Sequence, residues 1–283
     1  ARIDNPLNVL TDARKMSLDI RIVDPGAPRD ENGKVATAVK NIKENYDKWM
    51  DDRGTQLVFC DLSTPAKTAQ KEAGRIISET LEKLFGKKDA KRAKQQLAGM
   101  PYEKQWQYLV EKAEEIADSE TLSEERRDEI ATFMAAIEDP EATMNVADIG
   151  FSVYDDMREL LIKSGIPESE IAFIHDYNTP DQKERLFDRV NNGYVRVLLG
   201  SSAKMGAGTN AQRRLVALHH MDAPWRPSDV EQREGRIIRQ GNMLYERDPD
   251  GFEVDIKAYS TNNTSDTVMW QILQRKAGAI EQF

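Results

Sequence analysis

Cysteine and histidine are scarce in this chain of 283 residues, and both shortages limit its chemistry. Cys60 is the single cysteine, so no intramolecular disulfide can form, which is typical of a reducing compartment. Its position in an apolar run predicts that Cys60 is buried. Of the three histidines, His219 and His220 are adjacent on a predicted strand and therefore point to opposite faces. This arrangement disfavours a metal site, and we expect none.

Long hydrophobic runs are also missing. No apolar stretch approaches the roughly 20 residues that span a bilayer, and the first six residues lack the apolar centre of a signal peptide. We therefore expect a cytoplasmic protein without a membrane partner. Hydrophobic residues make up 39% of the chain and charged residues 31%, which is typical of a folded protein with many exposed helices.

The net charge of -9 disfavours a protein that coats nucleic acid through bulk attraction, because such binding needs clustered lysine and arginine. The balance is reversed between Gly200 and Gly241, where seven basic residues outnumber four acidic residues. For nucleic-acid binding, the local charge of this segment is therefore more informative than the net charge of the whole chain.

Short apolar runs bounded by turn residues predict five strands. These runs are Gln56 to Leu62, Ile171 to Ile174, Val195 to Leu199, Leu215 to Met221 and Phe252 to Tyr259. Helical patterns alternate with them, including Phe151 to Ser164 and a helix that Thr179-Pro180-Asp181-Gln182 opens as a capping box. The alternation predicts a doubly wound α/β fold with a mostly parallel sheet.

Residues 67–148 interrupt this alternation with Lys- and Glu-rich helical patterns and no strand. The predicted helices are Lys67 to Leu84, Ala90 to Leu97, Tyr102 to Ala117 and Ser123 to Ile137. We interpret the segment as an all-helical insertion in a domain made of residues 1–66 and 149–283. Helices with interleaved charges are typical of a solvated lid or hairpin, and a partner-binding element is the alternative.

The segment from Gln232 to Gly241, Gln-Arg-Glu-Gly-Arg-Ile-Ile-Arg-Gln-Gly, carries the strongest chemical signal. A helix capped by Ser228 and Glu231 would place Gln232, Arg236 and Arg239 on one face, since residues three and four apart are neighbours. The planar guanidinium binds phosphate oxygens in pairs, and an arginine beside a transferring γ-phosphoryl group stabilises its transition state. An exposed basic helix face is the alternative interpretation.

A glycine-rich loop follows the strand that ends at Leu199. Loops at the carboxyl ends of parallel strands bind ligands in α/β sheets. Gly206 and Gly208 permit close approach of a backbone, hydroxyl groups in the loop can donate to phosphates, and Lys204 adds a positive charge. A tight turn without a ligand is the alternative.

Together these segments resemble the C-terminal helicase domain of superfamily 2, and within it the Swi/Snf-type translocases of double-stranded DNA. The resemblance is carried by Ser201 to Asn210, by Asp222-Ala223-Pro224-Trp225-Arg226-Pro227, by Gln232 to Gly241 and, more loosely, by Asp176 to Pro180 with Arg185. It implies a RecA-like, three-layer α/β/α fold. Thr264 to Ile280 is similar to the C-terminal helix of that family.

The resemblance also implies roles for individual residues. Arg236 and Arg239 correspond to arginine fingers. The remaining residues of the ATP cleft are Gly206, Gly208, Thr209, Asn210 and Gln232. Those expected to contact DNA, mainly through phosphates, are Thr64, Ser202, Lys204, Trp225 and Arg226.

Some positions depart from the Swi/Snf pattern. Arg226 stands where asparagine is usual, Ile237-Ile238 replace Ala-His, and Asn242 replaces a final glutamine. These departures indicate an outlying branch, similar to the large helicase and methyltransferase fusion proteins of phages and plasmids. The resemblance therefore implies duplex DNA and a methyltransferase domain as partners, and it does not imply nucleosome remodelling.

The first domain of such motors holds ATP and Mg²⁺ with a phosphate loop, Gly-x4-Gly-Lys-Ser/Thr, and with an Asp-Glu pair in the pattern Asp-Glu-x-His, and neither pattern occurs in the sequence. Since the chain also begins without methionine, we expect a piece of a longer polypeptide that supplies the first RecA-like domain. The isolated chain should then have no ATPase activity. The alternatives are an inert DNA-docking or partner-binding scaffold, and a methyltransferase in which Asp222-Ala223-Pro224-Trp225 binds a target amino group.

Overall fold

The computed structural model describes most of the chain as two compact units. Residues outside the description are 1–5, 99, 101, 118–122, 124–127, 129, 131–150, 207–209, 236–239 and 281–283. The first unit comprises Ala1–Pro65 with Phe151–Phe283, and the second comprises Ala66–Gly150. The assignment of these units as a motor domain and an insertion stays a prediction.

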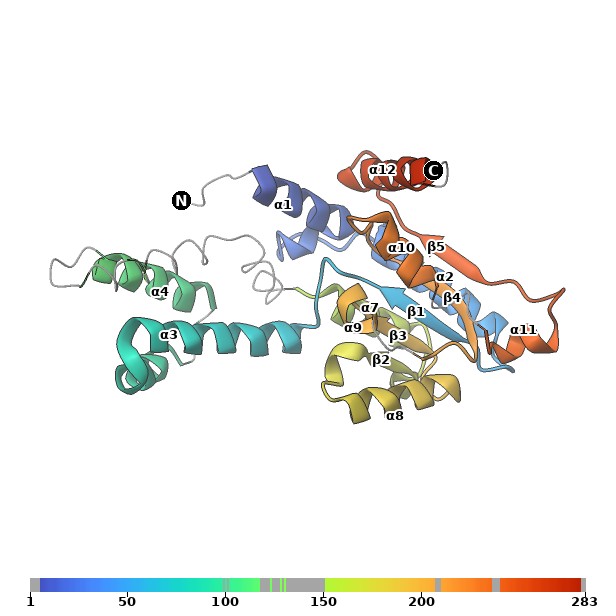
Figure 1. Ribbon diagram of the computed structural model, residues 1–283, viewed down its shortest axis with the longest axis horizontal. Helices are drawn as coiled ribbons and strands as arrows, with labels where there is room; N and C mark the ends of the chain where they lie inside the picture. The colour runs from blue at the N-terminus through green and yellow to red at the C-terminus, as the bar shows by residue number, and fades with distance from the viewer. Residues whose placement is uncertain are drawn as a thin grey trace. The chain divides into compact units, whose positions relative to one another are not determined.

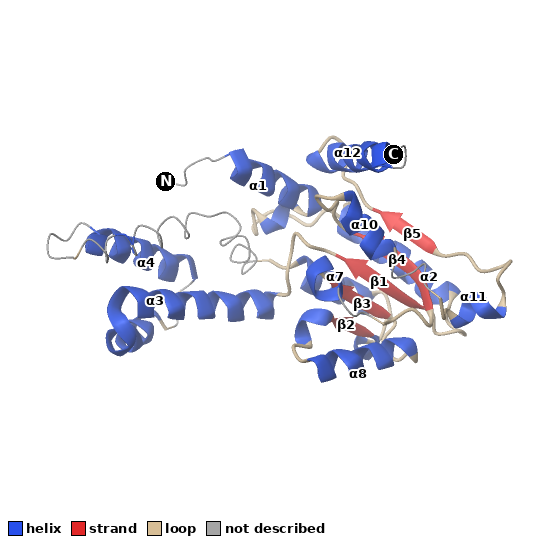
Figure 2. Cartoon of the chain, in the orientation of Figure 1, coloured by secondary structure: helices blue, strands red, loops and turns tan. Residues whose placement is uncertain are grey.

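The first unit is built on a five-stranded sheet (Figures 1 and 2). Its strands are β1 (Thr55–Phe59), β2 (Ile171–Phe173), β3 (Val197–Gly200), β4 (Leu215–His220) and β5 (Asp255–Ala258). The strand order is β2-β3-β1-β4-β5, and every neighbouring pair is parallel. All five predicted strands and the mostly parallel sheet are thus confirmed.

The central strands β1, β3 and β4 are buried and mostly apolar because both faces of the sheet are covered there, whereas the edge strand β5 is partly exposed. Leu57 pairs in register with Leu198 and Leu218, and all three belong to one hydrophobic cluster. Val58 and its register partner Leu199 belong to the cluster on the opposite face. Successive side chains therefore enter two separate cores, as the period of two residues in a strand requires.

Helices form a layer on each face of the sheet. The helices of this unit are α1 (Pro6–Leu18), α2 (Lys34–Lys48), α7 (Val153–Lys163), α8 (Pro180–Asn191), α9 (Ser202–Gly206), α10 (Pro227–Glu234), α11 (Met243–Arg247) and α12 (Ser265–Ile280). Helices α2 and α7 pack on one face, and α8 and α9 on the other. This three-layer arrangement is that of a RecA-like α/β fold. No described helix is both long and apolar enough to cross a membrane.

Two helix starts test the predictions from local sequence. The capping box at Thr179 is confirmed, because its side chain accepts from the backbone of Gln182 and the Gln182 side chain accepts in return. The cap at Ser228 is wrong: α10 begins at Pro227 with Arg226 as its N-cap and has no side-chain cap. Proline fixes φ and needs no hydrogen-bond partner in the first turn, so the N-cap lies two residues earlier than predicted.

The second unit has its own small core. Helix α3 (Ala66–Leu97) contains a non-helical residue at Gly86, with φ of 73°, so the predicted break between two helices is present within one continuous element. Helix α4 (Tyr102–Ala117) has the predicted bounds. Residues such as Leu81, Leu97 and Leu109 form the core between these helices. Most of the predicted helix at 123–137 lies outside the described residues.

Three buried polar side chains, those of Tyr259, His219 and Gln56, are hydrogen-bonded in series within the core on the α2 side of the sheet. Nδ1 of His219 lies 2.8 Å from the hydroxyl of Tyr259, and Nε2 lies 3.0 Å from Oε1 of Gln56. Burial lowers the pKa of His219 to about 3. Cys60 is also buried in this core, as its apolar surroundings in the sequence predict.

This burial predicts a pH dependence of stability. Between pH 6.5, the ordinary pKa of histidine, and about 3, the unfolded chain binds a proton at residue 219 that the folded chain does not. The free energy of unfolding should therefore fall with decreasing pH, by about 1.4 kcal/mol per unit from this residue well below pH 6.5. Urea unfolding of the wild type and the His219→Gln variant checks this. The variant should show a shallower dependence between pH 6 and 5, whereas equal slopes would contradict the assignment.

Candidate functional site

Three neighbouring strands end at the same edge of the sheet with polar residues just beyond them. Asp61 follows β1, Ser202 follows β3 and Asp222 follows β4. Strand β1 lies between β3 and β4, and all three are parallel. The carboxyl edge of a parallel sheet is where α/β folds bind ligands, so the topology brings these residues to the expected place.

Arg233 of α10 joins the ends of these three strands. Its Nη2 donates to Oδ2 of Asp61 at 2.6 Å and to Oδ1 of Asp222 at 3.2 Å. Its Nε donates to Oγ of Ser202 at 2.6 Å, and its Nη1 donates to the carbonyl of Asp222 at 3.0 Å. We call Arg233, Asp61, Asp222 and Ser202 the Arg233 cluster.

The two carboxylates of the cluster also hold backbone groups. The backbone N–H and the hydroxyl of Ser202 donate to Asp61 at 2.6 and 2.7 Å. Oδ2 of Asp222 accepts from the backbone N–H groups of Asp61 at 2.5 Å and Leu62 at 2.9 Å. The cluster thus fixes the backbone at the start of the glycine-rich loop as well as the end of β1.

Burial makes these ionic contacts strong. The side chains of Arg233 and Asp222 are both 1% exposed. Burial alone lowers the pKa of Arg233, but the facing carboxylates of Asp222 and Asp61 outweigh it and raise the pKa above its usual value. Because a buried charge left without its partner is costly, each member of the cluster depends on the others.

His220 completes the surroundings of Arg233 without adding charge. Its Nδ1 lies 3.3 Å from Nη1 of Arg233, and since a guanidinium can only donate, this nitrogen is the acceptor. Burial lowers the pKa of His220, and the charge of Arg233 acts in the same direction. The imidazole is therefore neutral near pH 7.

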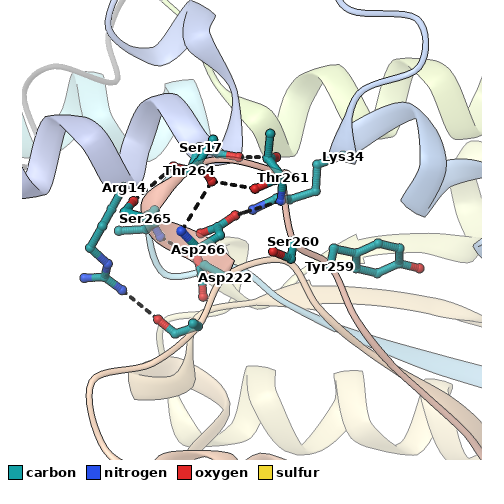
Figure 3. A network of polar contacts seen from close by, with 12 residues as sticks. Arg14, Ser17, Lys34, Asp222, Tyr259, Ser260, Thr261, Thr264, Ser265 and Asp266 are labelled. Carbon is teal, nitrogen blue, oxygen red and sulfur yellow. Dashed lines mark hydrogen bonds and ion pairs between the residues drawn. The ribbon is translucent and has the colours of Figure 1, made fainter. Parts of the chain in front are cut away.

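A second polar network fastens α1 and α12 beside this edge (Figure 3). Nη2 of Arg14 donates to the carbonyl of Ala223 at 2.6 Å, which ties α1 to the loop between β4 and α10. Lys34 and Asp266 form a buried ion pair between the start of α2 and α12. The hydroxyl of Thr261 donates to the carbonyl of Ser17 at 2.7 Å. The loop that precedes α10 is thus held from outside the cluster as well.

The predicted DNA-contacting residues occupy different environments. Lys204 and Arg226 are exposed, and Trp225 is 49% exposed with the Arg14 guanidinium 4.2 Å from its ring centroid. Thr64 is half-buried, and its carbonyl accepts from Ser152 at 2.8 Å. By contrast, the hydroxyl of Ser202 is held inside the Arg233 cluster.

The predicted ATP-cleft residues are only partly described. Gly206 ends the short helix α9, Gln232 is exposed on α10, and Asn210 is exposed, with its carbonyl accepting from Asn191 at 2.6 Å. Gly208, Thr209, Arg236 and Arg239 lie outside the described residues. The predicted helix at Gln232 to Gly241 is described only as far as Glu234, where α10 ends.

The sequence interpretation did not assign roles to Asp61 or Arg233. Arg233 stands in the arginine-rich segment but turns inward, whereas the interpretation considered only the face that carries Gln232. A signal was available, because Asp61 lies in the last two residues of one predicted strand and Asp222 directly follows another. Two carboxylates at one sheet edge need a cationic partner.

Comparisons with known proteins cover part of the chain. Residues 143–241 match the family model described as the helicase conserved C-terminal domain. The crystal structure of the C-terminal part of the Fun30 ATPase domain is similar at 12% identity and a TM-score of 0.36, covering 95% of this chain and 84% of that one. The search of curated proteins found no match. The coarser part of the resemblance, to a helicase C-terminal domain, is thus supported over residues 143–241.

The dependence of the fold on Arg233 can be tested by substitution. Arg233→Met leaves the buried carboxylate of Asp222 without its guanidinium partner, so the free energy of unfolding should fall by about 3–5 kcal/mol. Gln232→Met, at the exposed neighbouring position, is the matched control and should change it by less than about 0.5 kcal/mol. Urea denaturation of both variants measures the difference. A loss below about 1 kcal/mol for Arg233→Met would show that the cluster is not structurally important.

Proposed function

We propose that this chain contains the second motor domain of an ATP-dependent DNA translocase or helicase. The observation that carries the proposal is the match of residues 143–241 to a helicase C-terminal domain, since that range contains both the glycine-rich loop and the arginine segment. The Arg233 cluster supports it, because Ser202 at the start of the loop and Arg233 at the start of the segment are bonded to each other.

In this proposal Arg236 and Arg239 are arginine fingers. They follow Arg233, whose buried side chain holds the end of α10 at the carboxyl edge of the sheet. A planar guanidinium at the γ-phosphate offsets the charge that spreads over its oxygens during transfer, without any covalent step by the protein. Gly206, Gly208, Thr209, Asn210 and Gln232 would line the same side of the cleft.

In this proposal, the side chains at the carboxyl edge of the sheet supply one side of an ATP site and no metal ligands. Asp61 and Asp222 already bond Arg233, and among the described residues no group of three or more acidic, histidine or cysteine side chains could hold a metal ion. This side therefore offers cations and amide groups to ATP. We assign Mg²⁺ and most of the phosphate contacts to the first RecA-like domain, which the same polypeptide would supply.

We assign the DNA contacts mainly to exposed cations. Lys204 and Arg226 reach solvent near the ends of β3 and β4, where they can bind phosphates of duplex DNA without reading its sequence. Thr64 would add a contact after β1, and Trp225 would offer its exposed ring. Because the hydroxyl of Ser202 already bonds Asp61 and Arg233, its role at DNA would be to position Lys204. The parent would belong to an outlying part of the Swi/Snf-type branch, similar to the large helicase and methyltransferase fusion proteins of phages and plasmids.

The proposal predicts that the isolated chain hydrolyses no ATP. Phosphate release from the purified chain should stay at the level of a protein-free blank, with or without duplex DNA, because the phosphate loop is absent from the sequence. DNA-stimulated turnover by the chain alone would contradict the division of the ATP site between two domains.

Arg239→Ala in the parent polypeptide tests the assigned chemistry. The variant should lose DNA-stimulated ATP hydrolysis by about 10³-fold or more, the effect of an arginine finger, while its affinity for duplex DNA changes little. Steady-state phosphate release and fluorescence anisotropy measure the two properties. Gln240→Ala, at the next residue, serves as the control. Loss of hydrolysis together with DNA binding would instead indicate a structural role, as in the alternative of an inert docking scaffold.

A further inference from the structure

The second unit carries a cluster of positive charge that the motor proposal does not use. Between Lys83 and Lys94 the sequence has six basic residues and one acidic residue, in a chain whose net charge is -9. All six basic side chains are exposed. The charge is therefore concentrated on one stretch of α3, on the two sides of Gly86.

Four of these residues share one face of the helix after Gly86. Advancing about 100° per residue places Lys87, Lys88, Lys91 and Arg92 on the side opposite Ala90, Ala93 and Leu97. Those three apolar residues are buried in the core of the unit. We call Lys87, Lys88, Lys91 and Arg92 the basic face.

The basic face differs from an ordinary solvated helix surface. Elsewhere in this unit, opposite charges pair along the helices, as with Arg75 and Glu79 at 2.6 Å or Lys112 and Glu115 at 2.5 Å. On the basic face the pairs four residues apart are like charges, Lys87 with Lys91 and Lys88 with Arg92, and such pairs destabilise an isolated helix.

The start of the helical segment adds a second unfavourable contribution. Lys87 and Lys88 lie in the first turn after the non-helical Gly86, where the helix dipole disfavours cations. None of the four side chains of the basic face has an ion pair within the part of the chain that the structure describes. An external anion bound to this face would offset both unfavourable contributions.

The density of charge indicates the kind of anion. At about 1.5 Å per residue, the four cations extend over about 8 Å of helix axis. Duplex DNA carries one phosphate charge per roughly 1.7 Å of its own axis, so a comparable length presents four or five phosphates. We propose that the basic face binds the phosphate backbone of nucleic acid, as a contact separate from Lys204 and Arg226 of the first unit.

Fluorescence anisotropy with a labelled DNA duplex tests this proposal. The variant combines Lys87→Gln, Lys88→Gln, Lys91→Gln and Arg92→Gln. The matched control combines Lys40→Gln, Lys48→Gln, Lys163→Gln and Arg275→Gln, which removes three lysines and one arginine from exposed positions of the first unit. Both proteins have the same net charge, so a difference between them reflects position.

The variant should bind the duplex at least about 10-fold more weakly at low salt, and its plot of log affinity against log salt should be shallower by about 2–4, at roughly 0.9 per lost phosphate contact. The control should bind more tightly than the variant. Replacing the three lysines by arginine should keep the wild-type affinity. Because glutamine removes like-charge repulsion, the Tm of the variant should not fall.

Several outcomes would overturn the proposal. These are wild-type affinity and salt dependence in the variant, equal weakening in the control, no binding of duplex by the wild type, or a polyglutamate peptide that binds the basic face more tightly than DNA. A parallel variant with Lys204→Gln and Arg226→Gln separates this inference from the motor proposal. If only the variant with Lys204→Gln and Arg226→Gln binds the duplex more weakly, the basic face is not a DNA contact. The assignment of DNA contacts to Lys204 and Arg226 then stands.

Discussion

A buried guanidinium holds together the edge of the sheet on which the proposed function depends. Arg233 bonds Asp61, which precedes it by 172 residues, and Asp222 at the end of the neighbouring strand. Because the guanidinium and the carboxylate of Asp222 are both buried, separating them is costly, and the ends of β1, β3 and β4 therefore keep one arrangement. The same contact sets where the glycine-rich loop begins and where the arginine segment leaves α10.

The packing around the cluster reinforces this constraint from two directions. Two hydrophobic cores hold the parallel strands, one on each face of the sheet. On the outer side Arg14 binds the carbonyl of Ala223, and the buried pair of Lys34 and Asp266 joins α2 to α12. The loop before α10 is therefore held by α1 through Arg14 and by α12 through the packing of Met269 and Leu273 on Ala223.

Sequence patterns that extend over a few residues predicted the strands and one helix cap. Strand positions followed from apolar runs, and the cap at Thr179 followed from a capping box that satisfies backbone donors nearby. The cap at Ser228 was wrong because proline at 227 began the helix earlier. The role of Arg233 could not follow from the spacing within its helix, because its partners lie beyond the ends of three strands, β1, β3 and β4. Helix α1 was not predicted either; Arg14 and Ser17 bind it to residues more than 200 positions away.

The central claim is that Arg236 and Arg239 act on ATP held by another domain. A structure of the parent polypeptide with ADP, Mg²⁺, aluminium fluoride and duplex DNA tests it most directly. The account predicts that both guanidinium groups lie within hydrogen-bond distance, about 3 Å, of the aluminium fluoride or the adjoining phosphate oxygens. Guanidinium groups turned toward their own unit, or more than about 6 Å from the transferring group in the closed complex, would contradict it.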